Sequence, residues 1–227
     1  MKKSLLLYLI VLTFQIGFSQ SGPGGVGTND GSSTLELWLD PDEGISTTGV
    51  LIDSWADQSG NSLTMSSSGS DRPDLVSAML NNHDYSSFVQ SSDEYLGISA
   101  AISSIGSGNN RTILYVFQFT ANSNNLEIFG NVTAEMFDYG TFNQNDRLRI
   151  RNGGADVYSG SNSVSQNAWH IGSADYDGTN TRAWHDNTSI VNTASSAFAW
   201  GITSTFKIGG TNHSLARSFT GYIAEVI

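Results

Sequence analysis

The sequence predicts an all-β protein, a two-sheet antiparallel β-sandwich of the jelly-roll type. Apolar residues recur with a period of two in short runs, and Gly, Asn, Asp and Ser separate these runs. No segment keeps a sustained helical period. The 5 Trp, 8 Tyr and 11 Phe supply apolar surface for a packed core and argue against disorder.

Residues 1–19 are predicted to be a secretory signal peptide, outside the folded domain. Lys2 and Lys3 give a basic start, an almost unbroken apolar run follows, and Gly17 and Ser19 place small residues before a cleavage site. The run is short for a membrane anchor and polar residues soon follow it, so no membrane insertion is expected after cleavage, and a retained anchor is the weaker alternative. Residues 20–33 are a Gly-rich leader without the Gly-Lys-Ser/Thr of a phosphate loop.

Residues 34–227 are expected to form one domain of many short strands. Residues 35–39 open the series, and residues 111–119 form the longest apolar run, expected to be a central strand buried on both faces. Asp177 and Gly178 predict a hairpin, Asp186 and Asn187 a second tight turn, and residues 74–80 are the one short helical candidate. Further strands are expected at residues 126–129, 135–139, 147–150, 168–176, 181–185, 206–208 and 219–227.

Charge and cysteine content limit the partners. Without Lys2 and Lys3, eight Lys and Arg remain against 21 Asp and Glu, a net charge of about −13. This balance argues against nucleic acid and anionic membranes, which favour basic patches. The chain has no Cys, so neither a disulfide nor a lipoprotein thiol is expected.

Several short motifs follow one another along the chain. They are Leu-Glu-Leu-Trp-Leu-Asp at 35–40, Val-Leu-Ile-Asp-Ser-Trp-Ala-Asp-Gln-Ser-Gly-Asn at 50–61, Arg-Pro at 72–73, Leu-Asn-Asn at 80–82, Glu-Tyr-Leu at 94–96, Trp-His-Ile at 169–171 with Asp-Gly at 177–178, and Phe-Thr-Gly-Tyr-Ile-Ala-Glu-Val at 219–226. Individually they are common, but in this order and spacing they resemble the laminin-G-like, concanavalin A-like lectin and glucanase jelly rolls. The leader after a signal peptide also resembles secreted surface proteins of Bacteroidetes, of flavobacterial type.

The resemblance implies a secreted or cell-surface binding or adhesion module, acting on a glycan or a surface protein. Such modules are typically parts of larger proteins, and the sequence stops within a predicted strand. We therefore expect the domain to be truncated at its carboxy-terminal end, with the last strand pairing with residues 35–39 or a neighbour. A polysaccharide-active enzyme on the same fold and a structural spacer are the alternatives.

The sequence lacks the paired carboxylates, the zinc-ligand spacing and the serine-hydrolase motif of common hydrolases. A retaining glycosidase needs two carboxyls about 5–5.5 Å apart, but Glu135 and Asp138 are three residues apart on a strand and point to opposite faces. Asp93 and Glu94 also diverge. The four His follow no zinc spacing, and no Gly-x-Ser-x-Gly occurs. The four histidines are His83, His170, His185 and His213. His170 and His185 could face each other across the predicted hairpin, and a cross-strand pair at the surface is the ordinary interpretation. We expect no catalysis.

Calcium is the expected small partner. Asp53, Asp57 and Asn61 crowd one loop and offer the oxygen ligands that Ca²⁺ takes. The resemblance adds Glu225, in the closing strand, as a remote ligand. The alternatives are turn stabilisation for Asp57 and Asn61 and a solvated strand face for Glu225.

A glycan site requires an exposed aromatic platform with a polar rim. Trp38, Trp55 and Trp169 are expected to pack in the core or at its edge. Trp184, beside a turn, and Trp200, in a loop-like segment, are the candidate ligand-binding residues. A covering role at the edge of the sandwich is the alternative for both.

Overall fold

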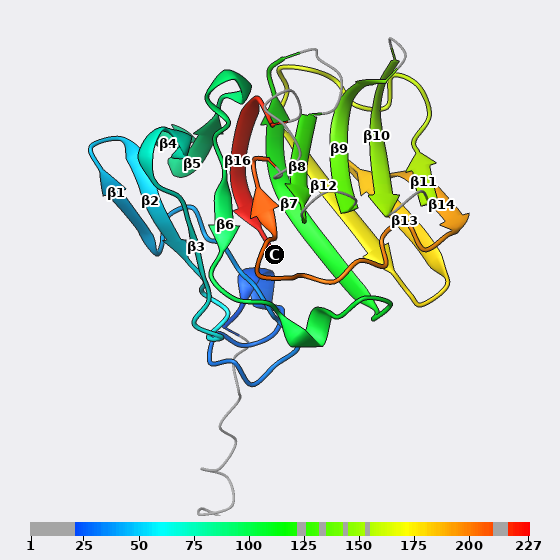
Figure 1. Cartoon of the computed structure of the whole chain (residues 1–227), viewed down its shortest axis with the longest axis horizontal. Helices are drawn as coiled ribbons and strands as arrows, with labels where there is room; N and C mark the ends of the chain where they lie inside the picture. The colour runs from blue at the N-terminus through cyan, green and yellow to red at the C-terminus, as the bar shows by residue number, and fades with distance from the viewer. Residues whose placement is uncertain (1–20, 122–125, 132–134, 143–144, 153–154, 211–217) are drawn as a thin grey trace, which may run out of the picture.

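The computed structural model describes residues 21–121, 126–131, 135–142, 145–152, 155–210 and 218–227, and its elements are almost all strands (Figure 1). Four short 3₁₀ helices accompany them, η1 (Pro23–Gly25), η2 (Gly69–Asp71), η3 (Gln90–Ser92) and η4 (Ser103–Ile105). The strands are β1 (Ile45–Thr48), β2 (Leu51–Ala56), β3 (Thr64–Ser66), β4 (Asp74–Leu80), β5 (His83–Phe88), β6 (Leu96–Ile98), β7 (Arg111–Phe119), β8 (Leu126–Gly130), β9 (Glu135–Phe142), β10 (Asn145–Asn152), β11 (Ala155–Tyr158), β12 (His170–Tyr176), β13 (Asn180–His185), β14 (Thr188–Ala194), β15 (Lys207–Ile208) and β16 (Gly221–Val226).

The strands follow one hydrogen-bonded path that folds back on itself into two layers. The path runs β11-β10-β9-β8-β15-β6-β3-β2-β4-β5-β16-β7-β12-β13-β14, and β1 pairs with β2. All pairings between these strands are antiparallel, and β8, β9 and β10 lie across from β7, β12 and β13 (Figure 1). The Tyr115 ring on β7 meets the Phe129 ring on β8 with centroids 5.1 Å apart, which joins the layers. The predicted all-β antiparallel sandwich is confirmed.

Strand β7 separates an inner from an outer face. Tyr115, Phe117 and Phe119 are buried, because alternate side chains of the strand face the opposite layer. Leu114, on the other face, is 40% exposed. The expectation that residues 111–119 are buried on both faces is therefore wrong, since their outer face is not covered by a third layer.

Strand β16 lies between β5 and β7, in the middle of its layer. At its end, Leu39 and Val226 form an antiparallel bridge, with the N–H of Leu39 donating to the carbonyl of Val226 over 2.8 Å. The expected pairing of the closing strand with residues 35–39 is thus observed as one bridge. Beyond it, Ile227 and Leu114 exchange backbone hydrogen bonds of 2.8 and 2.9 Å.

The predicted helix at residues 74–80 is wrong, since these residues form β4. β4 pairs with β5 across a tight turn in which Asn81 and Asn82 both have positive φ, 52° and 69°. Asn tolerates this conformation better than most residues, so the turn chemistry decides the hairpin. The predicted turns at 177–180 and 186–187 are confirmed, and Asp186 and Asn187 have φ of 46° and 67°.

The predicted signal peptide lies outside the described residues and stays a prediction. Within the described part of the chain, no helix is long and apolar enough to cross a membrane.

Candidate functional site: an exposed aromatic face

Three aromatic side chains from distant parts of the sequence meet on the outer face of the layer that contains β7. Tyr222 on β16 lies opposite Ser87 of β5 and Gln118 of β7, so it stands between these strands. Its ring centroid is 4.9 Å from Tyr85 and 6.0 Å from Trp169, and Tyr85 lies 5.2 Å from Trp169. We call Tyr85, Trp169 and Tyr222 the aromatic cluster.

The strand alternation keeps the cluster accessible. His170 faces the interior and is buried, so Trp169, just before it, faces outward. All three rings are partly exposed. Burial of part of its ring raises the pKa of Tyr85, and the neighbouring Tyr222 adds to this. The cluster is a partly desolvated aromatic surface with an open side.

An apolar ridge continues the aromatic cluster along β7 and β12. Ile171 lies opposite Val116, and Ser173 lies opposite Leu114. Ile171 is 61% exposed and Leu114 is 40% exposed. Contiguous apolar side chains on a protein surface are a common feature of binding sites.

Acidic side chains lie close to the ridge, and Glu225 on β16 is opposite Val116 of β7. The indole N–H of Trp38 donates to Glu225 Oε1 over 3.0 Å, which orients both side chains. His83 pairs with Asp42 at the surface. The hydrogen bond to Asp42 raises the pKa of His83, and the charge of Glu225 acts in the same direction. The rim is therefore polar and predominantly negative.

The two predicted ligand-binding tryptophans have different positions. Trp200 is 2% exposed and packs against Phe198 and Phe206, with centroids 5.4 and 5.8 Å away. It is no exposed platform, because the segment 197–200 folds into the core. Trp184 is partly exposed on the outer face of β13, opposite Ser189 and Ser173, and its ligand-binding role stays a prediction.

Sequence reasoning placed Trp169 in the core or at its edge and overlooked the cluster. The signal that could have placed Trp169 outside is the alternation after it, because Ala174 and Tyr176 face inward and His170 shares their parity. Trp55 does lie in the core, with 0% exposure.

Each of the predicted calcium ligands forms hydrogen bonds to other residues. Asp53 accepts hydrogen bonds from Thr48 and from Arg72, the latter over 2.5 Å. These bonds to Thr48 and Arg72 lower the pKa of Asp53. An arginine already neutralises this carboxylate, so it is poorly disposed to hold a cation.

Asp57 and Asn61 stabilise the backbone around them. Asp57 Oδ1 accepts the N–H groups of Trp38 and Ser59, both over 2.8 Å. The amide of Asn61 donates to the carbonyls of Leu35 and Glu36 over 3.0 and 3.2 Å. Glu225, the fourth predicted ligand, accepts a hydrogen bond from Trp38. Calcium binding by Asp53, Asp57, Asn61 and Glu225 stays a prediction.

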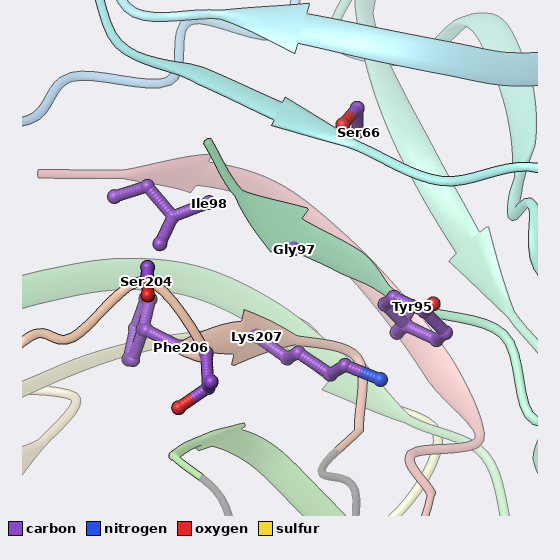
Figure 2. A pocket seen from close by; sticks show the side chains of 8 residues that line it. Ser66, Tyr95, Gly97, Ile98, Ser204, Phe206 and Lys207 are labelled. Carbon is purple, nitrogen blue, oxygen red and sulfur yellow. The ribbon is translucent and has the colours of Figure 1, made fainter. Parts of the chain in front are cut away.

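A cavity of about 310 Å³ opens on the other layer, beside β6 and β15 (Figure 2). Lys207 extends along it with its Nζ 3.2 Å from the centre of the Tyr95 ring. Burial lowers the pKa of Lys207. A desolvated amine over an aromatic face is a cation–π contact, which fixes the lysine in place. The cavity is lined by Ser66, Tyr95, Gly97, Ile98, Ser204, Thr205, Phe206 and Lys207.

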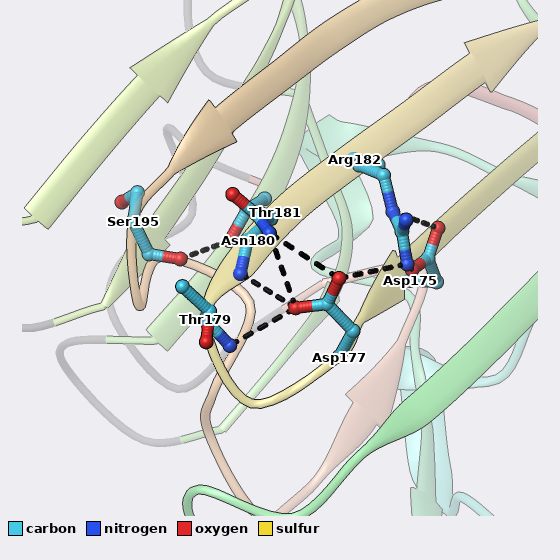
Figure 3. Close-up of polar contacts among 7 residues, drawn as sticks. All are labelled: Asp175, Asp177, Thr179, Asn180, Thr181, Arg182 and Ser195. Atoms are coloured by element: carbon cyan, nitrogen blue, oxygen red, sulfur yellow. Dashed lines mark hydrogen bonds and ion pairs between the residues drawn. The ribbon is translucent and has the colours of Figure 1, made fainter.

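Two carboxylates do approach each other at the β12–β13 hairpin, but an arginine joins them (Figure 3). Arg182 lies 2.5 Å from Asp175 and 3.2 Å from Asp177. Asp177 also accepts the N–H groups of Asn180 and Thr179, and these bonds lower its pKa. An acid catalyst needs a raised pKa, whereas the pKa of Asp177 is lowered by the hydrogen bonds with which it stabilises the turn.

The sequence also drew attention to Glu135, Asp138, Asp93 and Glu94. Glu135 and Asp138 lie in β9, and their side chains are outside what the structure describes. Glu94 Oε2 accepts the N–H of Val89 over 2.8 Å, and burial raises the pKa of Glu94 to about 7. Asp93 accepts the hydroxyl of Ser218.

The sequence predicted that His170 and His185 form a pair at the surface. This prediction is wrong, because both side chains face the interior, with 6% and 5% exposure. Their ring centroids are 4.2 Å apart, and Asp186 lies beside both. Burial and next the neighbouring His170 lower the pKa of His185 to about 4. This cluster holds the candidate metal ligands within the described residues.

No protein-family model matches the chain, and no curated protein sequence matches it. Solved structures are similar to it in fold. Domain 4 of AbnA, an extracellular GH43 arabinanase from Geobacillus stearothermophilus, in complex with arabinotriose, has a TM-score of 0.59 at 10% identity, over 84% of this chain and 89% of that one.

Two toxin domains are also similar. The binding domain of Paraclostridial Mosquitocidal Protein 1 has a TM-score of 0.59 at 13% identity, over 84% of this chain. The binding domain of Botulinum neurotoxin DC, in complex with rat synaptotagmin II, has a TM-score of 0.53 at 11% identity, over 84% of this chain. The chain spans 48% and 46% of these two proteins. At such identities the likeness establishes the β-sandwich fold.

Proposed function

We propose that the chain is a secreted, non-catalytic carbohydrate-binding module of the laminin-G-like class, in a larger surface protein of Bacteroidetes type. The observation that carries the proposal is the aromatic cluster of Tyr85, Trp169 and Tyr222. Aromatic faces stack on the apolar faces of sugar rings, and polar groups at the rim select hydroxyls. Domain 4 of AbnA, a similar sandwich, was solved with arabinotriose, which supports this ligand class.

The negative charge of the protein favours neutral glycans over acidic glycans as ligands. The chain carries a formal net charge of −11, and Glu225 and Asp42 border the face that contains the cluster. Uronic acids and sialic acids would meet like charge there, which costs affinity and slows association.

A glycan array of neutral and acidic oligosaccharides, followed by calorimetry on each hit, tests the proposal. Tyr222→Ala and Trp169→Ala are expected to weaken binding of a neutral glycan at least about tenfold. Tyr158→Ala is the matched control, because Tyr158 is 42% exposed on β11, away from the cluster. Trp184→Ala separates the cluster from the tryptophan suggested by the sequence.

The array is run with and without calcium, which tests the predicted ion at the same time. Binding that survives both cluster variants would refute the role of the cluster. Binding of acidic glycans alone would refute the charge argument. Hydrolysis of a bound glycan would revive the enzyme alternative.

A protein ligand is the second candidate, favoured by the apolar ridge of Leu114, Val116 and Ile171. The toxin domain in complex with synaptotagmin II, a similar sandwich, supports this class. An Ile171→Asp variant that loses adhesion to a protein-coated surface while keeping glycan binding would support it. A spacer would bind neither.

A further inference from the structure

We propose that His170, His185 and Asp186 form a binding site for a divalent transition-metal ion of the zinc type. One ligand atom from each residue can be chosen so that all of them lie within 4.8 Å of one another. Two imidazole nitrogens and one carboxylate are a donor set for Zn²⁺, whereas calcium takes oxygen ligands. This site is separate from the aromatic cluster and from the loop where calcium was expected.

The sheet topology brings the three residues together. His170 begins β12 and His185 ends β13, and these strands pair so that His185 lies opposite Gly172. His170 and His185 are therefore diagonal neighbours on the inner face, with their ring centroids 4.2 Å apart. Asp186 follows at once in the turn, where its left-handed conformation directs the carboxylate back toward the rings.

Two of the proposed ligands, His170 and Asp186, are each oriented by a hydrogen bond to a backbone group outside the site. His170 Nε2–H donates to the carbonyl oxygen of Ser165 over 2.9 Å, which leaves Nδ1 directed at Asp186 Oδ2, 2.6 Å away. Asp186 Oδ1 accepts the N–H of Ile171 over 2.9 Å, which leaves Oδ2 for the ion. Metal-ligating His and carboxylate side chains are oriented by such outer hydrogen bonds.

The distances suit a small ion after modest movement. Ligand atoms about 2.0–2.1 Å from a tetrahedral zinc lie about 3.3 Å from each other. Asp186 Oδ2 is now 2.6 Å from His170 Nδ1 and 3.7 Å from His185 Nε2, on either side of that value. The Asp186 side chain is 50% exposed, so it can adjust and it opens the site to solvent. A water can take the fourth position.

The test titrates the full chain with Zn²⁺ alone by calorimetry at pH 7.5. About one equivalent is expected, and Co²⁺ in its place is expected to give the strong visible bands of a four-coordinate site. His185→Gln and Asp186→Asn are each expected to weaken Zn²⁺ binding at least about tenfold and to remove the Co²⁺ bands. Asp186→Asn keeps an oxygen that can accept the Ile171 N–H, so this variant is expected to fold. It therefore still tests the proposal if His185→Gln does not fold.

His83→Gln is the matched control, because His83 also pairs with an aspartate, Asp42, but on the surface. It is expected to leave Zn²⁺ affinity unchanged. Three results would overturn the proposal. They are no uptake of Zn²⁺ by the folded protein, wild-type affinity in Asp186→Asn, and loss of binding in His83→Gln. In the first case, His170 and Asp186 form a hydrogen-bonded pair only.

Discussion

Gly172→Ala tests how tightly the Tyr115 ring packs over the glycine of the neighbouring strand. Gly172 on β12 lies opposite Tyr115 on β7, and its Cβ would be 2.3 Å from Tyr115 Cζ, 2.4 Å from Cε2 and 2.6 Å from the hydroxyl oxygen. Ordinary contacts between carbon atoms are about 3.5–4.0 Å, so the ring would have to move by more than about 1 Å. Tyr115 is 1% exposed and packs on Phe117 and Phe129 with centroids 5.2 and 5.1 Å away, which leaves it little room.

Overpacking of a core typically costs about 1–3 kcal/mol of unfolding free energy, and we expect the upper end, about 3 kcal/mol, because the ring is held on two sides. For a domain of this size, each kcal/mol lowers Tm by about 2–4 °C, so Tm is expected to fall by about 6–12 °C. Urea and thermal unfolding followed by circular dichroism measure both quantities.

Gly160→Ala is the control for Gly172→Ala, since nothing lies within 4 Å of a Cβ at Gly160. Its unfolding free energy is expected to stay within about 0.5 kcal/mol of the wild type. If Gly172→Ala were as stable as Gly160→Ala, the packing of Tyr115 over Gly172 would be refuted.

Two further predictions concern the partly buried carboxyl of Glu94 and the tryptophans. Burial raises the pKa of Glu94 to about 7 from 4.5, so the folded state binds the proton more tightly, and the contribution of Glu94 to stability is lost as pH rises from about 4.5 through about 7. The fall in Tm across this range is expected to be smaller in Glu94→Gln, and an equal fall would exclude Glu94 as its source. Trp200→Ala is expected to cost about 3–5 kcal/mol of unfolding free energy, because Trp200 is 2% exposed, whereas Trp184→Ala, at the surface, costs less than about 1 kcal/mol. Equal losses of urea stability in the two variants would contradict these positions.

Local chemistry made much of the fold predictable. The period-two runs placed most strands, and the residues that tolerate positive φ placed the turns at 177–180 and 186–187. The hairpin of β4 and β5 was missed because Asn81 and Asn82 were not recognised as its turn.

The candidate site was not predictable in the same way, because it depends on strand order. Tyr85, Trp169 and Tyr222 meet only since β16 is inserted between β5 and β7, a long-range arrangement that no local pattern encodes. Trp200 lies in a segment without periodicity, so its burial among Phe198 and Phe206 could not be foreseen. The burial of His170 and His185, by contrast, follows from the alternation of their strands.

The position of β16 also sets an order of folding. Only β6 and two short 3₁₀ helices separate β5 from β7 in the chain, yet the place between these strands in the sheet is filled by Gly221–Val226, far along the sequence. Until this segment arrives, β5 and β7 present unpaired edges, which are sites for misassociation. Closing such a long loop carries an entropic cost before its contacts form, so we expect slow, late completion of the sandwich. A chain interrupted before Gly221 would therefore retain two open edges in the middle of its layer and be prone to aggregate.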